Sequence, residues 1–188
     1  SGYEFDPERA MQLLRESKYG DDLDNLPPIT ITTPGSFGAN VSLDMEVVLA
    51  MWEKNLGIKT EFQQTEFATF LKDLNKRRFQ MFDIGWIADY PDPENFLDIL
   101  FYSDSSNNHT NYSNPAVDAL LERARIETDE TLRFSIYNEA EQAILDDAPW
   151  IPLWYSGERH LLVKPNVHDF LQTPLIIPKL RYVYLTDE

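Results

Sequence analysis

The chain has 188 residues, of which 43% are hydrophobic and 13% aromatic, so it can bury a sizeable core and is neither disordered nor fibrous. Its formal net charge is −16, from 16 basic and 32 acidic side chains. Nucleic-acid binders need a basic surface and anionic lipid headgroups repel negative charge, so we expect a soluble protein with no nucleic-acid partner.

The chain contains no cysteine, which excludes disulfides, thiol catalysis and thiolate metal sites. It opens on Ser1-Gly2-Tyr3 and leads straight into a helix signal, without a basic and apolar leader. We therefore interpret it as a fragment of a longer protein.

The first predicted element is a helix that begins after Asp6, where a capping carboxylate precedes a proline and an acid. Ala10, Leu13, Leu14 and Ser17 follow at helical spacing. This pattern predicts one buried stripe along the helix.

Strands and helices then alternate. We expect strands at residues 29–33, 58–63 and 81–87, because these runs are β-branched or apolar and are bounded by turn residues. Between them, one helix carries Met45, Val48, Leu49 and Trp52 on one face and stops at Gly57. The next is capped by Thr65 and carries Phe67, Phe70, Leu71 and Leu74. The alternation favours an α/β layer structure with some parallel pairing.

The second half is predicted to be mainly helical. A short helix at 94–101 and a polar loop at 103–113 precede two longer helices. The apolar stripes of these helices are Val117, Leu120, Leu121 and Ala124, and then Leu132, Ile136, Ala140, Ala143 and Ile144. Strand-like pieces at 150–155, 159–163 and 180–185 close the chain.

Catalytic motifs are absent from the sequence. The histidines at 109, 160 and 168 lack metal-binding spacing, and there is no nucleophile elbow, phosphate-binding loop or dinucleotide fingerprint. The acidic cluster Asp89, Asp92 and Glu94 is a possible metal loop or carboxylate pair, but it lacks the ligand alternation of a calcium loop. We expect no enzyme activity, no catalytic residue, no metal and no cofactor.

Residues 85–96, GWIADYPDPENF, form the most informative segment. Within five residues a predicted strand delivers Trp86, Asp89 and Tyr90 to a turn stiffened by two prolines. Rigid aromatics next to an acid make a good wall for a small ligand. The alternative is that Trp86 belongs to the core and Asp89 caps the next turn.

This segment resembles the signature of the family 5 extracellular solute-binding proteins, the oligopeptide- and dipeptide-binding receptors of ABC importers. Four other segments resemble the same family in the correct order: FDPERAMQLLRES at 5–17, MWEKNLGIKTEF at 51–62, NYSNPAVDALLERAR at 111–125 and LRFSIYNEAEQAILDDAPWIPLWY at 132–155. The resemblance spans roughly residues 4 to 185. It implies an α/β fold with a mixed sheet flanked by helices, in which residues 1–188 are a single C-terminal lobe of a type II periplasmic-binding-protein fold. The N-terminal lobe is then missing from this chain.

The resemblance also implies a ligand site. Asp89 corresponds to the aspartate that pairs with the α-ammonium group of a bound peptide, and Trp86 would line the same wall. Tyr90 and Tyr112 are weaker candidates. Some relatives carry an arginine at the position of Asp83, and an acid there would repel a ligand carboxylate.

The implied function is the substrate-binding component of an ABC transporter, which captures extracytoplasmic peptides or a related small solute for import. Its partners would be the ligand, the permease subunits and the missing lobe. It would work in the periplasm or lipid-anchored at the outer face of the cell membrane. A peptide-binding chaperone or signalling receptor on the same fold is the alternative, and a carboxylate-dependent hydrolase is a third class.

Overall fold

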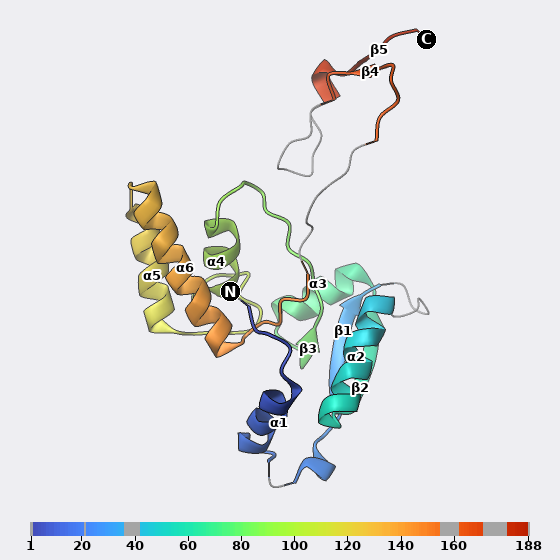
Figure 1. The fold of residues 1–188 in the computed structure, drawn as a ribbon, viewed down its shortest axis with the longest axis vertical. Coiled ribbons are helices and arrows are strands. Elements are labelled where there is room, and N and C mark those ends of the chain that lie inside the picture. Colours follow the sequence, from blue (N-terminus) through green and yellow to red (C-terminus); the bar gives the residue numbers. More distant parts are fainter. Residues whose placement is uncertain (1, 21, 36–41, 155–161, 171–179, 188) are drawn as a thin grey trace. The chain divides into compact units, whose positions relative to one another are not determined.

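The structure is a computed structural model that describes residues 2–20, 22–35, 42–154, 162–170 and 180–187 (Figure 1). The chain forms two compact units, residues 1–85 and residues 86–188, and each is described by itself. No helix in the described ranges is long and apolar enough to cross a membrane.

The first unit alternates helices and strands. Its elements are α1 (Pro7–Glu16), a 3-10 turn (Leu23–Asn25), β1 (Ile29–Pro34), α2 (Leu43–Leu56), β2 (Thr60–Thr65), α3 (Phe67–Asn75) and β3 (Met81–Phe82). Two predicted boundaries are confirmed. The Asp6 carboxylate accepts a hydrogen bond from the Arg9 backbone N–H at 2.8 Å, and Gly57 ends α2 with φ of 68°.

The cap predicted for α3 was wrong by one residue. Thr65 is still paired with Pro34 as the last residue of β2, so it cannot begin the helix. Glu66 caps α3 instead, because its carboxylate accepts from the backbone N–H groups of Ala68 and Thr69.

The sheet of the first unit has the order β2-β1-β3, and both strand pairs are parallel. Ile29 pairs with Thr60, and Ile31 pairs with Met81. Parallel pairing was predicted from the alternation of elements and is confirmed. The three strands therefore end at the same edge of the sheet, where ligand sites of α/β proteins usually lie.

Strand β3 is shorter than the predicted strand at 81–87, and Pro34 gives a physical reason. Along β1 the backbone N–H groups alternate in direction. Ile29 donates to Lys59 before β2, whereas Thr30 donates to the side chain of Gln80 before β3. Pro34 faces β3 by the same alternation but has no N–H to donate, so the ladder stops after the Asp83 N–H has reached the Thr32 carbonyl at 3.1 Å.

Packing in the first unit is concentrated on α3 and β1. Phe70 and Leu74 of α3 and Ile31 of β1 are buried, and the Phe70 ring stacks on Phe79 with centroids 5.1 Å apart. In contrast, α1 has no buried residue and Leu13 is 50% exposed, so the buried stripe predicted there was wrong. Helical spacing shows that one face is apolar, but it does not show that another element covers that face.

The second unit is built on three helices: α4 (Glu94–Phe101), α5 (Pro115–Ile126) and α6 (Glu130–Asp147). Helices α5 and α6 lie side by side (yellow and orange in Figure 1). The predicted bounds of α4 are confirmed. Ten buried side chains form the core: Leu100, Phe101, Val117, Leu120, Leu121, Ala124, Ile136, Tyr137, Ala140 and Ile144. The predicted stripe of α5 is therefore confirmed in full, whereas Leu132 of the α6 stripe is exposed.

Of the three strands predicted at the end of the chain, one was wrong and one was partly right. Residues 150–154 form no strand, and most of the piece at 159–163 lies outside the described residues. Residues 180–182 form a 3-10 turn, and the short strand β5 (Tyr184–Leu185) pairs antiparallel with β4 (Val167–His168). The predicted α/β class is confirmed, but the predicted mixed sheet is not, because the described strands form one parallel sheet and a separate antiparallel pair.

Candidate functional site

The predicted site residues are divided between the two units. Asp83 follows β3 in the first unit, whereas Trp86, Asp89, Tyr90 and Tyr112 belong to the second. Trp86 and Asp89 come four and seven residues after the end of β3 and lie on an irregular segment. Residues 86–94, the segment that leads into α4, are called the binding loop below.

The buried amide of Asn95 fixes the binding loop from inside. Asn95 is 0% exposed, and its Oδ1 accepts hydrogen bonds from the Trp86 indole Nε1 at 3.0 Å and from the Asp89 backbone N–H at 3.2 Å. One carbonyl oxygen therefore holds both ends of the four-residue Trp-Ile-Ala-Asp segment. The half-buried Trp86 ring also packs against the helical core.

An ion pair fixes the same loop from the side of α6. The Arg133 guanidinium donates to both oxygens of the Asp92 carboxylate at 2.7 and 2.8 Å, and it lies over the Tyr137 ring. Asp92 also accepts from the Glu94 backbone N–H at 2.9 Å. The Arg133 guanidinium lowers the pKa of Asp92. Because the pair is bidentate, it fixes the orientation of the Asp92 carboxylate as well as its distance from Arg133.

The Asp89 side chain is exposed, and no hydrogen bond or ion pair is recorded for its carboxylate within the described residues. The alternative reading made Asp89 a turn cap, but Asp92 supplies the carboxylate that accepts from the next turn. The other half of that reading is partly right, since Trp86 does pack against the core. The geometry leaves the Asp89 carboxylate available to a ligand.

The hydroxyls of both tyrosine candidates already donate hydrogen bonds within the second unit. The Tyr90 hydroxyl donates to Glu94 at 2.6 Å. The Tyr112 hydroxyl donates to Asp147 at 2.6 Å, and this bond lowers the pKa of Asp147. Burial and the same bond raise the pKa of Tyr112. A ligand role for either hydroxyl stays a prediction, and it would require exchange of these bonds.

Asp83 lies in a hollow at the carboxyl edge of the parallel sheet, called the edge hollow below. Its volume is about 280 Å³, and it is lined by Thr33, Pro34, Ser42, Met45, Phe62, Gln64, Asp83, Ile84 and Gly85. Burial raises the pKa of the Asp83 carboxyl. Thus Asp83, which the sequence singled out for its charge, lies at a pocket that the sequence did not predict.

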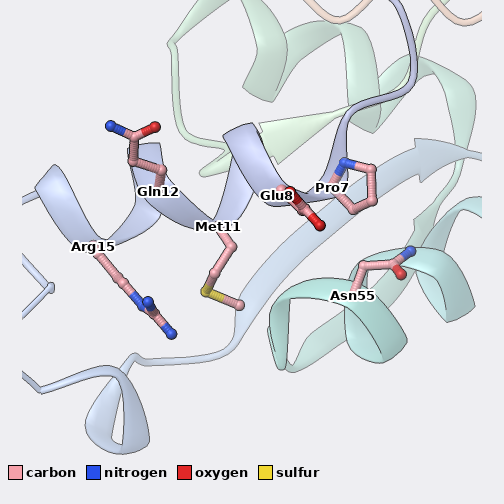
Figure 2. A pocket seen from close by; sticks show the side chains of 6 residues that line it. All are labelled: Pro7, Glu8, Met11, Gln12, Arg15 and Asn55. Carbon is pink, nitrogen blue, oxygen red and sulfur yellow. The ribbon is translucent and has the colours of Figure 1, made fainter.

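A second hollow of about 420 Å³ lies in the same unit between α1 and α2 (Figure 2). Five of its lining residues come from α1, including Met11 and Arg15, and Asn55 comes from α2. None of its described lining residues comes from a strand, and its charged groups, Glu8 and Arg15, have opposite signs. It does not present one kind of charge to a ligand.

Metal-binding groups do not converge in the part of the chain that the structure describes, since no three His, Asp or Glu side chains come together there. His168 stacks on Tyr184 with centroids 5.0 Å apart, and its Nε2 is hydrogen-bonded with the Thr186 hydroxyl at 3.0 Å. His160 lies outside the described residues.

Sequence reasoning missed Asn95 and Arg133. Asn95 is the eleventh residue of the GWIADYPDPENF segment, so its place in the motif was a usable signal. Arg133 lies 41 residues from Asp92, and no local pattern joins the two.

The chain therefore has an α/β fold, with a hollow at the ends of parallel strands in the first unit and an exposed carboxylate on a hydrogen-bonded loop in the second. The chain belongs to the bacterial extracellular solute-binding proteins of family 5, because the model of that family's middle segment matches residues 1–108.

Individual relatives agree with this assignment. The periplasmic murein peptide-binding protein MppA of Escherichia coli is 32% identical over 179 residues, which cover 94% of this chain and 32% of that protein. Its solved structure has a TM-score of 0.80 at 29% identity, over 97% of this chain and 35% of the other. The structure of DppA from Helicobacter pylori in complex with the peptide STSA gives 0.78 at 28% identity, with coverage of 97% and 35%. The first five curated relatives are each covered over 20 to 32% of their length, so the chain spans a third of them or less.

Proposed function

We propose that residues 1–188 form the C-terminal lobe of a two-lobed receptor that captures extracytoplasmic peptides for an ABC importer. The observation that carries this proposal is the exposed Asp89 carboxylate on a loop held by Asn95 and Arg133. The relatives support the peptide class, since one is named a murein peptide-binding protein and another was solved with a bound peptide.

The proposed chemistry is recognition of the peptide's α-ammonium group by Asp89. A charge-assisted hydrogen bond in a closed cleft contributes about 1.5–3 kcal/mol. Such a bond contacts only the terminus, so it suits a receptor that accepts many side chains. Trp86 would form the neighbouring wall, because its ring is already fixed by Asn95.

Closure by the second lobe would exclude water and add contacts on the opposite side of the ligand. The remaining proposed partners are that lobe and the permease subunits of the importer. The family to which the chain belongs is one of binding proteins, so the proposal includes no reaction. The proposed location is the periplasm or the outer face of the cell membrane.

The decisive experiment compares Asp89→Asn with the unchanged full-length protein, using calorimetry with free and N-acetylated peptides. Removing one partner of a desolvated charge pair costs about 2–5 kcal/mol, so affinity for free peptides should fall by about thirtyfold or more. N-acetylated peptides have lost the ammonium charge and should be affected much less.

Asp129→Asn is the matched control. Asp129 caps α6 by accepting from the Leu132 backbone N–H, and asparagine caps a helix equally well. This variant deletes the same charge from the second unit and should leave peptide affinity unchanged. Equal weakening of both ligands by Asp89→Asn would make Asp89 structural, and failure of every peptide to bind would exclude peptides as the ligand class.

A further inference from the structure

The edge hollow has a definite place in the fold. Thr33 and Pro34 end β1, Gln64 lies at the end of β2, and Asp83, Ile84 and Gly85 follow β3. The walls therefore come from the carboxyl edge of all three parallel strands, and α2 contributes Met45. The backbone ladder holds the strand ends that form most of these walls.

The walls combine an apolar lining with one charge. Met45, Phe62, Pro34 and Ile84 provide apolar surface, whereas Ser42, Thr33 and Gln64 are neutral and polar. Among the lining residues that the structure describes, Asp83 is the one that is ionisable. Long basic side chains match this combination, since their methylene stems pack on apolar surface and their heads carry the charge.

The Asp83 carboxylate has no cation beside it in the described part of the chain. Its recorded hydrogen bond is made by the backbone N–H, and no described arginine or lysine forms an ion pair with it. Burial alone accounts for its raised pKa. A half-buried anion without a partner is costly, and an incoming cation would offset that cost.

The size of the hollow limits what it can hold. Pockets for drug-sized ligands measure roughly 300–1,000 Å³, and the edge hollow measures about 280 Å³. It therefore suits a single side chain better than a whole peptide.

We propose that the edge hollow is a specificity subsite for a basic side chain of the bound peptide, and that Asp83 is the charge partner of that side chain. This inference rests on the proposed capture of peptides and adds a preferred substrate class, peptides that contain lysine or arginine.

The test uses the full-length protein and alanine tetrapeptides in which lysine, norleucine or glutamate replaces each residue in turn. Norleucine keeps most of the lysine stem and removes the charge. At one position, lysine should bind at least about tenfold more tightly than norleucine, and glutamate should bind most weakly. Asp83→Asn should reduce the lysine preference to near one and leave the norleucine peptide unaffected.

Glu61→Gln provides the matched control. Glu61 lies on β2 next to Phe62, and because side chains alternate along a strand it faces away from the hollow. Glu61→Gln removes one negative charge from the same sheet as Asp83→Asn does. If lysine peptides bound only because the protein is acidic overall, both variants would reduce the lysine preference equally. The proposed subsite predicts that only Asp83→Asn changes the preference.

Each outcome decides the inference. Retained binding of the norleucine peptide shows that Asp83→Asn is folded, so a lysine preference that survives the substitution overturns the subsite. Absence of any lysine preference in the unchanged protein also overturns the subsite. In that case the proposed capture of peptides still stands if Asp89→Asn weakens the binding of free peptides. If no tetrapeptide binds, the proposed function fails and the subsite fails with it.

Discussion

Asp83 and Asp89 both follow strand β3, yet the two units hold these carboxylates in different ways. Asp89 is exposed, and the loop that carries it is fixed by Asn95 and by the Asp92–Arg133 pair. Asp83 is half-buried in a hollow, and its backbone N–H is bonded to Thr32. In the two proposals, the exposed carboxylate would select a ligand group by its position and the half-buried one would select it by its charge.

The extent of buried packing also differs between the two units that carry these carboxylates. The binding loop leads into helices whose ten buried side chains form one core. The first unit rests on a three-stranded sheet covered in part by α3, and its α1 buries no residue. We therefore expect the second unit to respond strongly to changes in packing and the first to respond mainly to changes in charge.

Leu121→Ala should have the largest effect. Leu121 is 0% exposed in the core of the second unit, and such truncations cost about 2–5 kcal/mol. Leu13→Ala makes the same change on α1, where the side chain is 50% exposed, and should cost less than about 0.5 kcal/mol. Hydrogen exchange measured by mass spectrometry should show lost protection in α4 to α6 for the first variant only. Comparable costs for the two variants would remove the contrast between the units.

Arg133→Met should have the next largest effect, because it leaves the Asp92 carboxylate without its partner. Both side chains are about a quarter exposed, and solvent weakens an ion pair that it reaches. The free energy of unfolding should therefore fall by about 1–2 kcal/mol. The pKa of Asp92 is lowered in the folded protein, so its contribution is present above its ordinary value of 3.8 and is lost as pH falls through the folded pKa. Denaturant unfolding should therefore show a gap between the two proteins at pH 7 that closes in strong acid. A gap that does not depend on pH would mean that the Arg133 stem, not its charge, matters.

Helix caps give a smaller contrast. Asp129→Ala removes the cap of α6, which contributes core side chains, and should cost about 1 kcal/mol in the second unit. Asp6→Ala removes an equivalent cap from α1 and should lead to local fraying with little change in thermal unfolding. Helix-resolved hydrogen exchange distinguishes the two, and a cooperative loss of stability from Asp6→Ala would show that α1 is more firmly packed than its exposure indicates.

Asp83→Asn should have the smallest effect on stability and should raise it. Burial raises the pKa of Asp83 in the folded protein, so the folded state holds its proton more tightly than the unfolded state. Stability is then lost as pH rises from the ordinary value of 3.8 through the raised pKa. The variant should melt slightly higher than the unchanged protein at pH 7, and the difference should vanish in strong acid. A lower melting temperature at pH 7 would show that ionised Asp83 is stabilised by a partner.

The sequence alone determined the features that depend on neighbouring residues. The cap at Asp6, the helix end at Gly57 and the bounds of α4 follow from rules that act over a few residues. The stripe of α5 was also correct, since its four apolar residues share one helical face and all are buried. The binding loop stood out because its aromatics, acid and prolines are adjacent in the chain.

Tertiary structure alone decided how these elements meet. Whether a stripe is covered depends on a neighbouring surface, so α1 and α5 look alike in sequence and differ in burial. The length of β3 depends on Pro34, which lies in another strand. Asn95 and Arg133 support the binding loop through bonds that span 6 to 41 residues, and the edge hollow is enclosed by three strand ends that only the parallel register brings together. Local propensity depends on neighbouring residues, whereas these contacts form only when distant parts of the chain come together. No local sequence pattern predicts which distant parts will meet.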